Sequence, residues 1–187
     1  MADRILVVRH GATEWSVSGQ HTSSTDLPLL EQGREQAVAV ADKLAGTEFE
    51  LVLCSPLRRA RETCELAGFS DAAEICEDLV EWGYGDYEGL TSPEIWELAP
   101  SWNLWRDGCP GGEYPAEIAA RVDRVLKRFD EIDGNGLAFA HGHVLRVLTA
   151  RWLEMEGSAG ARFKLDAGSI GMLGHERATR VVERWSV

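Results

Sequence analysis

The sequence has few cysteines, no long apolar run and no segment of the kind that directs secretion. Its cysteines, Cys54, Cys64, Cys76 and Cys109, lie far apart and form no C-x-x-C motif. That spacing argues against a zinc site and against a disulfide framework, and free thiols suit the reducing cytoplasm. The start, Met-Ala-Asp-Arg before a short apolar run, lacks the form of a secretory signal. No apolar stretch approaches membrane-spanning length, so we expect a cytoplasmic protein without a membrane segment.

Positive charge is also scarce: 19 lysines and arginines stand against 31 aspartates and glutamates, for a net charge of −12. A field of this sign would repel nucleic acid and anionic membranes, so neither is an expected partner. A small anionic substrate is still compatible, because a few arginines in a cleft can overcome a diffuse negative surface. Arginines do cluster at one place, where Arg58, Arg59 and Arg61 follow an apolar run.

The order of predicted elements favours one α/β domain that spans residues 1–187. Apolar runs predict strands at 5–8, 50–54, 73–80 and 137–140, with further strands and turns after 162. Amphipathic patterns predict helices at 31–44, 55–67, 115–130 and 144–153. Strands that alternate with helices in this way form a mostly parallel central sheet.

Two segments between these elements are predicted to be irregular. Residues 11–30 are polar and contain Gln20, His21 and Thr22, and a loop of this length in a compact domain is usually functional. Residues 82–112, called the flap below, are rich in tryptophan, glycine and proline and are expected to hold one short helix. The flap tryptophans pack internally in the simplest interpretation, and a patch that supports a homodimer is the alternative.

Polar side chains follow three of the predicted strands directly. Arg9 and His10 end the first strand, Arg59 comes soon after the second, and His141 ends the strand at 137–140. Because the carboxyl ends of parallel strands share one edge of a sheet, we expect these side chains to meet. Two histidines and two arginines without a third metal ligand suit an anion better than zinc, and the arginine fork matches phosphate oxygens.

The segment after the second strand carries its own signals. Ser55 followed by Pro56 predicts a helix start with a hydroxyl N-cap. Arg58 and Arg61 each precede a glutamate by four residues, so we expect solvated ion pairs there. Arg59 lies at the border of the buried stripe, and helical side chains lean toward the N-terminus, so it should lean toward the strand end.

Four motifs, in this order, resemble the histidine phosphatase superfamily, the family of cofactor-dependent phosphoglycerate mutases and their phosphatase relatives. They are Arg9-His10-Gly11-Ala12-Thr13-Glu14-Trp15, Ser55-Pro56-Leu57-Arg58-Arg59-Ala60-Arg61-Glu62-Thr63, the Glu81 loop that ends in Tyr87-Glu88-Gly89, and Ala140-His141-Gly142-His143. The resemblance covers nearly the whole chain. It implies a three-layer sandwich with helices on both faces of the sheet, and a reaction that needs neither metal nor cofactor.

The resemblance also implies roles for individual residues. His10 resembles the nucleophile that becomes phosphohistidine, and Arg9, Arg59 and His141 resemble the rest of the phosphate pocket. Glu81 resembles the general acid, and Asp78, Asp86 and Glu88 are the alternative carboxylates nearby. The acid must hold a proton, which partial burial beside Trp82 and the charge of the incoming phosphate would favour. A free nitrogen on His10 requires the other ring nitrogen to donate to an acceptor such as a backbone carbonyl.

Substrate contacts are expected from Gln20, His21, Thr22 and Gly142, with His143 at the pocket rim or structural. The segments around 15–28 and 82–89 look more like those of sugar-phosphate and broad acid phosphatases than of the mutases. Family members often have glycine after the position of Thr22, whereas Ser23-Ser24 stands here, so added side chains are expected to narrow or re-aim the pocket. The leading prediction is a phosphomonoesterase that hydrolyses small phosphorylated metabolites.

Two other functions are weighed against this prediction. A phosphoglycerate mutase would resemble this chain at its core, but such mutases have longer and more basic insertions than residues 82–140 provide. Water should therefore reach the intermediate here, which favours hydrolysis. A catalytically silent domain that binds phospho-ligands would usually have lost the nucleophile or an arginine, and this chain keeps both.

Overall fold

The computed structural model describes residues 2–187, and within them six strands form one sheet in the order β3-β2-β4-β1-β5-β6. The strands are β1 (Arg4–Arg9), β2 (Leu51–Cys54), β3 (Ala73–Ile75), β4 (Asn135–Ala140), β5 (Ile170–Glu176) and β6 (Thr179–Arg184). Neighbouring strands are parallel from β3 to β1, whereas the β1–β5 and β5–β6 pairs are antiparallel. The predicted mostly parallel sheet is confirmed.

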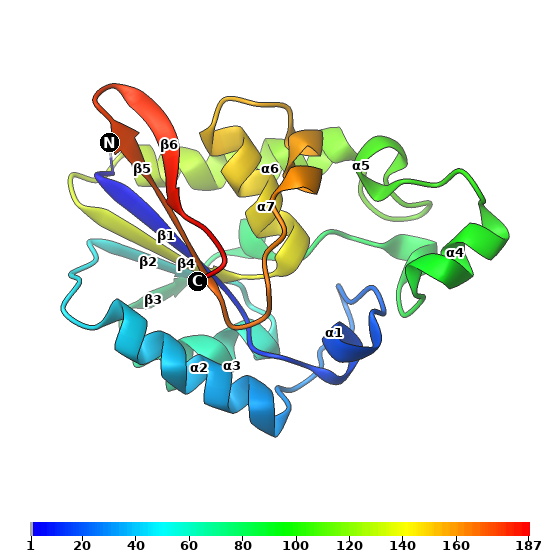
Figure 1. The fold of residues 1–187 in the computed structure, drawn as a ribbon, viewed down its shortest axis with the longest axis horizontal. Helices are drawn as coiled ribbons and strands as arrows, with labels where there is room; N and C mark the ends of the chain where they lie inside the picture. Colours follow the sequence, from blue (N-terminus) through cyan, green and yellow to red (C-terminus); the bar gives the residue numbers. More distant parts are fainter. Residues whose placement is uncertain (1) are drawn as a thin grey trace.

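Helices cover both faces of this sheet (Figure 1). Helices α2 (Glu31–Leu44) and α3 (Arg58–Leu66) lie on one face, and α6 (Pro115–Asp130) and α7 (Gly142–Trp152) lie on the other. Strand β1 is buried on both sides: Ile5 and Val7 pack with α6 and α7, while Leu6 and Val8 pack with α2 and α3. The alternation of a strand's side chains between two helical layers makes the three-layer sandwich that was expected.

Six shorter elements connect the layers: α1 (Glu14–Ser18), η1 (Glu77–Leu79), η2 (Gly85–Tyr87), α4 (Ser92–Leu98), α5 (Leu104–Asp107) and η3 (Gly157–Arg162). They correct the sequence prediction in three places. The loop at 11–30 contains α1, because Thr13 and Ser16 form a capping box at its start. The flap holds two short α-helices, α4 and α5, where one was expected. The strand predicted at 73–80 ends at Ile75, and η1 follows it.

Helix α3 begins at Arg58 and not at Ser55, which is a further correction. Leu57 occupies the N-cap position without a side-chain hydrogen bond. The hydroxyl of Ser55 lies instead 2.7 Å from Nε2 of His141, a residue that is 86 positions away in the sequence. The same hydroxyl also accepts a longer, 3.4 Å bond from the Leu57 amide, so a long-range partner shares the group that the local pattern assigns to the helix cap.

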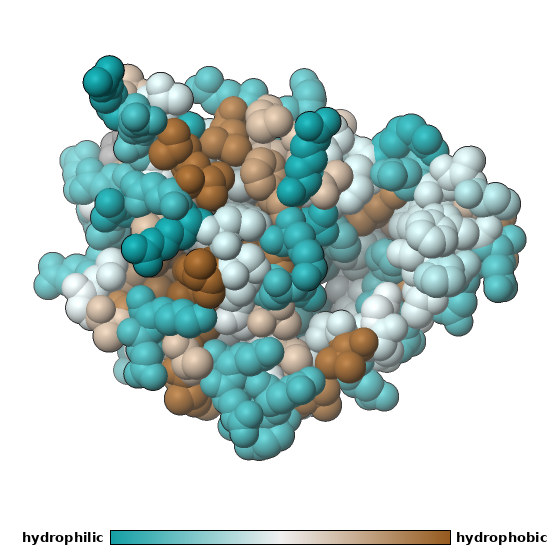
Figure 2. Space-filling model, in the orientation of Figure 1, coloured by the Kyte–Doolittle hydropathy of each residue, from teal (hydrophilic) through white to brown (hydrophobic). Residues whose placement is uncertain are grey.

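The flap extends away from the sheet, and the face in view is hollowed between it and the rest of the molecule (Figures 1 and 2). Trp102 and Trp105 are partly buried against the core, while Trp96 is 49% exposed. Internal packing thus explains two of the three tryptophans. Within residues 2–187, no helix is both long and apolar enough to span a membrane.

Candidate active site

A cavity of about 260 Å³ opens where β1 and β4 end, and most of the predicted site residues line it. These are Arg9, His10, Gln20, His21, Thr22, Glu81 and Gly142. Arg59 and His141 are fully buried and lie beneath the cavity, with the His141 ring centroid 5.1 Å from that of His10. The structure thus brings all the predicted residues together, but it places two of them under the wall of the cavity.

His10 follows the last residue of β1 and is held by the backbone on both sides. Its amide donates to the carbonyl of Ala140 over 3.0 Å, which ties it to the end of β4. Its Nδ1 lies 2.7 Å from the carbonyl oxygen of Gly11, and because a carbonyl can only accept, Nδ1 carries the hydrogen. Burial, followed by the charges of Arg59 and Arg9, lowers the pKa of His10 well below its ordinary value. The ring is therefore neutral, and Nε2 has a free lone pair.

The tight turn after His10 depends on glycine. A Cβ at Gly11 would lie 2.1 Å from the carbonyl oxygen of Gly33 in α2, and a Cβ at Gly33 would meet the backbone of Ala12. The two glycines therefore let the start of α2 touch the turn that carries the histidine.

Arg9 presents an unsatisfied donor at the cavity. Its Nη1 donates to the carbonyl of Leu165 over 2.6 Å, whereas its buried Nε makes no hydrogen bond within residues 2–187. A buried N–H without a partner is costly, and a phosphate oxygen would satisfy it. The guanidinium lies against Gly142, since a Cβ there would be 3.4 Å from Arg9 Cζ, which is an ordinary van der Waals contact.

Arg59 and His141 form a second layer, which is joined by hydrogen bonds to the loop above it. Nε of Arg59 donates to Nδ1 of His141 over 3.1 Å, and its Nη atoms donate to the carbonyls of Thr22, Ser23 and Thr25. Burial is the main cause that lowers the pKa of both groups, and the charge of Arg59 lowers the pKa of His141 further. Arg59 thus fixes the 22–25 loop and the imidazole while it contributes a positive charge under the cavity.

Glu81 is 6% exposed, and its carboxyl group is oriented by backbone amides. Oε1 accepts from the amides of Trp82 and Val144 over 2.8 and 2.9 Å, and Oε2 accepts from the amide of His143 over 3.0 Å. Two of these amides belong to the first turn of α7, where the helix dipole also attracts a carboxyl group. Glu81 is therefore held at the start of the helix that follows His141.

The loop at 20–25 is fastened to the flap rather than free. Gln20 Nε2 donates to the carbonyl of Gly89 over 2.9 Å, and His21 Nδ1 donates to that of Leu90 over 2.7 Å. The carboxylate of Glu88 accepts from the amides of Ser23 and Thr25.

This arrangement corrects the expectation for Ser23-Ser24. The Ser23 amide donates to Glu88, and within the described chain neither serine lines the cavity. The side chains of Ser23 and Ser24 therefore do not narrow the cavity.

Several cavity residues were missed by the sequence analysis, chiefly Trp15, Tyr84 and Arg146. Tyr84 is buried, its pKa is raised well above the ordinary value by burial, and its hydroxyl lies 2.6 Å from Nδ1 of His143. Arg146 lies four residues after Gly142 on α7, so the two share one helical face. That spacing was a usable signal once α7 was placed directly after His141.

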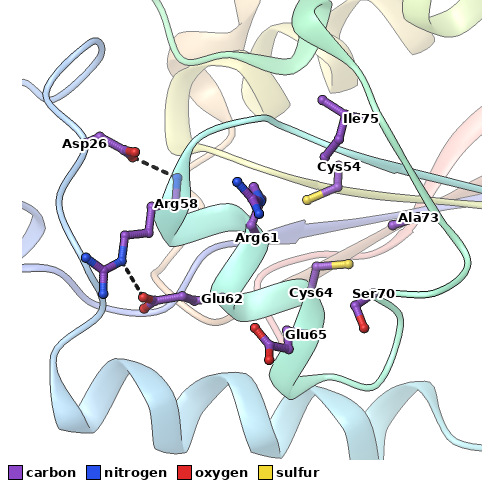
Figure 3. Close-up of a pocket in the computed structure, with 10 residues that line it drawn as sticks. All are labelled: Asp26, Cys54, Arg58, Arg61, Glu62, Cys64, Glu65, Ser70, Ala73 and Ile75. Carbon is purple, nitrogen blue, oxygen red and sulfur yellow. Dashed lines mark hydrogen bonds and ion pairs between the residues drawn. The ribbon is translucent and has the colours of Figure 1, made fainter.

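A larger cavity of about 570 Å³ lies beside α3 and does not include the candidate active site (Figure 3). Arg58 and Arg61 line it, with Cys54 and Cys64. Arg58 Nε donates to Glu62 over 2.6 Å, as the i,i+4 spacing predicted, and the Arg58 amide donates to Asp26 (Figure 3). All four cysteines of the chain are buried and unpaired, and burial raises the pKa of Cys109 to about 12.

The donor set of the active-site cavity suits an anion. Arg9, Arg59 and Arg146 supply fixed positive charge, and the amides at the start of α7 are occupied by Glu81. Among residues 2–187, no cluster of three or more His, Cys, Asp and Glu side chains is placed to hold a metal ion. The arrangement can bind a phosphate group, attack it with a neutral imidazole and supply a carboxyl group nearby.

Comparison with known proteins agrees with this geometry. Residues 5–187 match the family described as the histidine phosphatase superfamily (branch 1). An acid phosphatase of Mycobacterium tuberculosis is 39% identical over 181 residues, which cover 95% of this chain and 89% of that protein. Sedoheptulose 1,7-bisphosphatase of Saccharomyces cerevisiae is 37% identical over 184 residues, covering 81% and 68%. A solved structure of an open reading frame product from Mycobacterium tuberculosis superposes with a TM-score of 0.92 at 36% identity, covering 100% and 98%.

The chain therefore belongs to the histidine phosphatase superfamily. This confirms the resemblance found in the four motifs and the expected α/β sandwich. Both curated relatives are named phosphatases, which confirms the prediction of an enzyme that hydrolyses phosphate esters of small metabolites.

Proposed function

We propose that His10 is the nucleophile and Glu81 the general acid of a phosphomonoesterase in one domain that spans the chain. Nε2 of His10 attacks the phosphorus, so that a P–N bond forms as the ester P–O bond breaks. Glu81 gives its proton to the departing oxygen. Water then attacks phosphorus and gives a proton to Glu81, the P–N bond breaks, and inorganic phosphate leaves.

The observation that carries this proposal is the bond between His10 Nδ1 and the Gly11 carbonyl. It leaves the lone pair on Nε2, the atom that must attack. Arg9 contributes the unsatisfied Nε–H to the phosphate, and Arg59 and His141 supply charge and support from below. Gln20, His21, Thr22 and Gly142 would contact the remainder of the substrate.

We also propose that activity extends into mildly acidic solution, in keeping with an acid phosphatase. The lowered pKa of His10 keeps its ring neutral below the pH at which an ordinary histidine gains a proton. A phosphoglycerate mutase is the alternative; it would return the phosphoryl group to an acceptor before water arrives. The short segment at 82–140 favours hydrolysis.

Two further expectations are kept as proposals. A cytoplasmic location follows from the free thiols. A homodimer through the flap is supported by Trp96 and Leu98, which are 49% and 70% exposed. Light scattering after size-exclusion chromatography tests the dimer, and a Trp96→Ser variant should then shift toward monomer.

The decisive test is the His10→Ala variant, with His175→Gln as the matched control at a histidine outside the cavity. His10→Ala should fold, as judged by circular dichroism, but lose hydrolysis of p-nitrophenyl phosphate. The wild-type enzyme, quenched during turnover, should carry acid-labile, base-stable phosphate that the variant lacks. Full activity of folded His10→Ala would end the phosphohistidine mechanism. Interconversion of phosphoglycerates that outpaces phosphate release would favour the mutase.

A further inference from the structure

The cavity contains a third arginine that the phosphate reaction does not use. Arg146 lies on α7 and lines the cavity together with Arg9, His10 and Glu81. Burial is the main cause that lowers its pKa, and the charges of Glu81 and Tyr84 act in the opposite direction. It is therefore a partly buried cation within the electrostatic reach of the general acid.

Two backbone carbonyls and one aromatic ring hold the side chain of Arg146 in place. Its Nε donates to the carbonyl of Gly160 over 3.0 Å, and its Nη2 donates to that of Ala161 over 2.9 Å. Its Cζ lies 4.6 Å from the centroid of the Trp105 ring. Within residues 2–187 its Nη1 makes no hydrogen bond, so the guanidinium is fixed but keeps one donor group unused.

The positive charges in the cavity exceed those that the ester phosphate itself would engage. A phosphate ester carries two negative charges, which Arg9 and Arg59 can match. Burial lowers the pKa of His143, so that this ring is neutral and adds no charge. Arg146 is a further positive charge that the ester phosphate does not engage, and a second anion would give it a charged partner.

We propose that Arg146 binds a second anionic group of the substrate, so that preferred substrates are phosphate esters that also carry a carboxylate or a second phosphate. This rests on the proposed function, because it assumes that the ester phosphate lies against Arg9 and His10. The fixed guanidinium can then form a charge-assisted, two-point contact with the second group. Arg146 is in this sense a specificity-determining residue and not part of the bond-breaking step.

The test compares substrates that differ in the second group alone. Glycerol 3-phosphate and 3-phosphoglycerate differ by an alcohol in place of the carboxylate, and fructose 6-phosphate and fructose 1,6-bisphosphate differ by the second phosphate. Wild-type enzyme should have a higher kcat/KM for the doubly anionic member of at least one pair. The pair that shows the preference identifies the group as a carboxylate or a phosphate.

The Arg146→Gln variant should remove this preference. We expect kcat/KM for the doubly anionic substrate to fall about 10- to 100-fold, mainly through KM, as for a lost charge-assisted hydrogen bond. The fall in kcat/KM should be much smaller for the other member of the pair, whose second group is uncharged. Arg146→Lys keeps the positive charge but lacks the forked guanidinium, so it should retain an intermediate preference. This variant also provides the test if Arg146→Gln folds poorly. Arg151→Gln, on the same helix but paired with Asp123 at the surface, is the matched control and should behave as wild type.

Two results would overturn this inference. One is a wild-type enzyme that shows no preference within either pair. The other is an equal loss on both members of a pair in Arg146→Gln and Arg146→Lys, which would make Arg146 a support for η3. Failure of the proposed function looks different, because then folded His10→Ala would keep releasing phosphate from these substrates, or the wild-type enzyme would release it from none of them.

Discussion

The Nε–H of Arg59 donates to Nδ1 of His141 over 3.1 Å, and this bond decides which ring nitrogen carries the hydrogen. Because Nδ1 accepts, the hydrogen of the neutral ring lies on Nε2, which is 2.7 Å from Ser55 Oγ and can donate to it. Both nitrogens of His141 are therefore engaged beneath the cavity. The arginine and the histidine form one unit, and a change in either alters the other.

Replacement of Arg59 by lysine tests this unit. Arg59→Lys keeps the positive charge but cannot hold His141 and the carbonyls of Thr22 and Thr25 at once. We expect kcat/KM for p-nitrophenyl phosphate to fall about 100-fold or more and the free energy of unfolding to fall by about 3 kcal/mol. Enzyme assays and urea unfolding measure both.

Arg58→Lys is the control, because Arg58 is one position away and its side chain is exposed at the surface with Glu62 as partner. A change there should cost less than about 1 kcal/mol and leave the activity intact. Wild-type activity in Arg59→Lys would show that charge alone is required beneath the cavity.

Buried neutral histidines should make the stability depend on pH. The pKa values of His10, His141 and His143 are all lowered, with burial as the first cause in each. Below about pH 6.5 the unfolded chain binds protons at these residues that the folded chain does not bind. The free energy of unfolding is therefore highest above that pH and falls as the pH decreases. The buried pair His10 and His141 gives a slope of about 2.5 kcal/mol per pH unit between pH 6 and 5, and His143, whose side chain is 25% exposed, adds up to about 1.4 kcal/mol per pH unit.

Urea unfolding at pH 7, 6 and 5 measures this slope directly. The carboxylates whose pKa is lowered, such as Glu113, act in the same direction but only at lower pH. His141→Asn removes one of the three groups, so its slope should be smaller by about 1.4 kcal/mol per pH unit. A free energy of unfolding that stays constant from pH 7 to pH 5 would contradict the protonation states assigned to all three rings.

Glu81→Gln should separate proton donation from binding. Alkyl phosphates have poor leaving groups that need a proton, whereas the nitrophenolate ion leaves without one. We expect kcat to fall about 100-fold or more on glycerol 3-phosphate and much less on p-nitrophenyl phosphate. The ratio of the two rates is the measurement, because a general loss of structure would lower both alike.

The glutamine side chain itself will cost some stability. Its oxygen can still accept from Trp82 and Val144, but its amide nitrogen then faces the amide of His143, and two donors oppose each other. We expect a loss of about 1–3 kcal/mol, so the rates are compared well below the unfolding temperature. Equal losses on both substrates would assign Glu81 a binding role.

The three strand-end positions could be predicted because each depends on local order. A buried strand that ends in Arg9-His10 and another that ends in His141 must meet when the strands are parallel, whatever the loops do. Helices such as Glu31–Leu44 were also predictable, since their apolar residues repeat with the helical period.

The parts that could not be predicted depend on long-range partners. Ser55 lies outside α3, and its shorter bond is to His141, while Arg59 bonds to carbonyls of a loop that precedes it by more than 30 residues. Helix α1 was missed because its capping box uses Ser16 where glutamate or glutamine is usual. Arg146 was missed because the start of α7 was placed two residues too late.

The backbone around Glu81 is held by an ion pair that offers the last prediction. Arg121 is 6% exposed and binds both carboxylate oxygens of Glu113 over 2.7 and 2.8 Å. It also donates to the carbonyls of Val80 and Glu81, while Glu113 accepts from the amide of Gly83. The pair thus positions the residues on both sides of the general acid without contact with the reacting atoms.

Removal of one partner alone would leave a buried charge and cost about 3–5 kcal/mol, which would obscure any effect on the reaction. The double variant Arg121→Met/Glu113→Leu removes both charges and should be much closer to wild type in stability. We expect it to show the signature of a misplaced general acid: kcat about 10-fold lower on glycerol 3-phosphate, with little change on p-nitrophenyl phosphate. Arg124→Met/Asp78→Leu, a surface pair that also bridges α6 and η1, is the control and should change neither rate. If the buried double variant lowers both rates alike, or neither, the pair supports the fold without positioning Glu81.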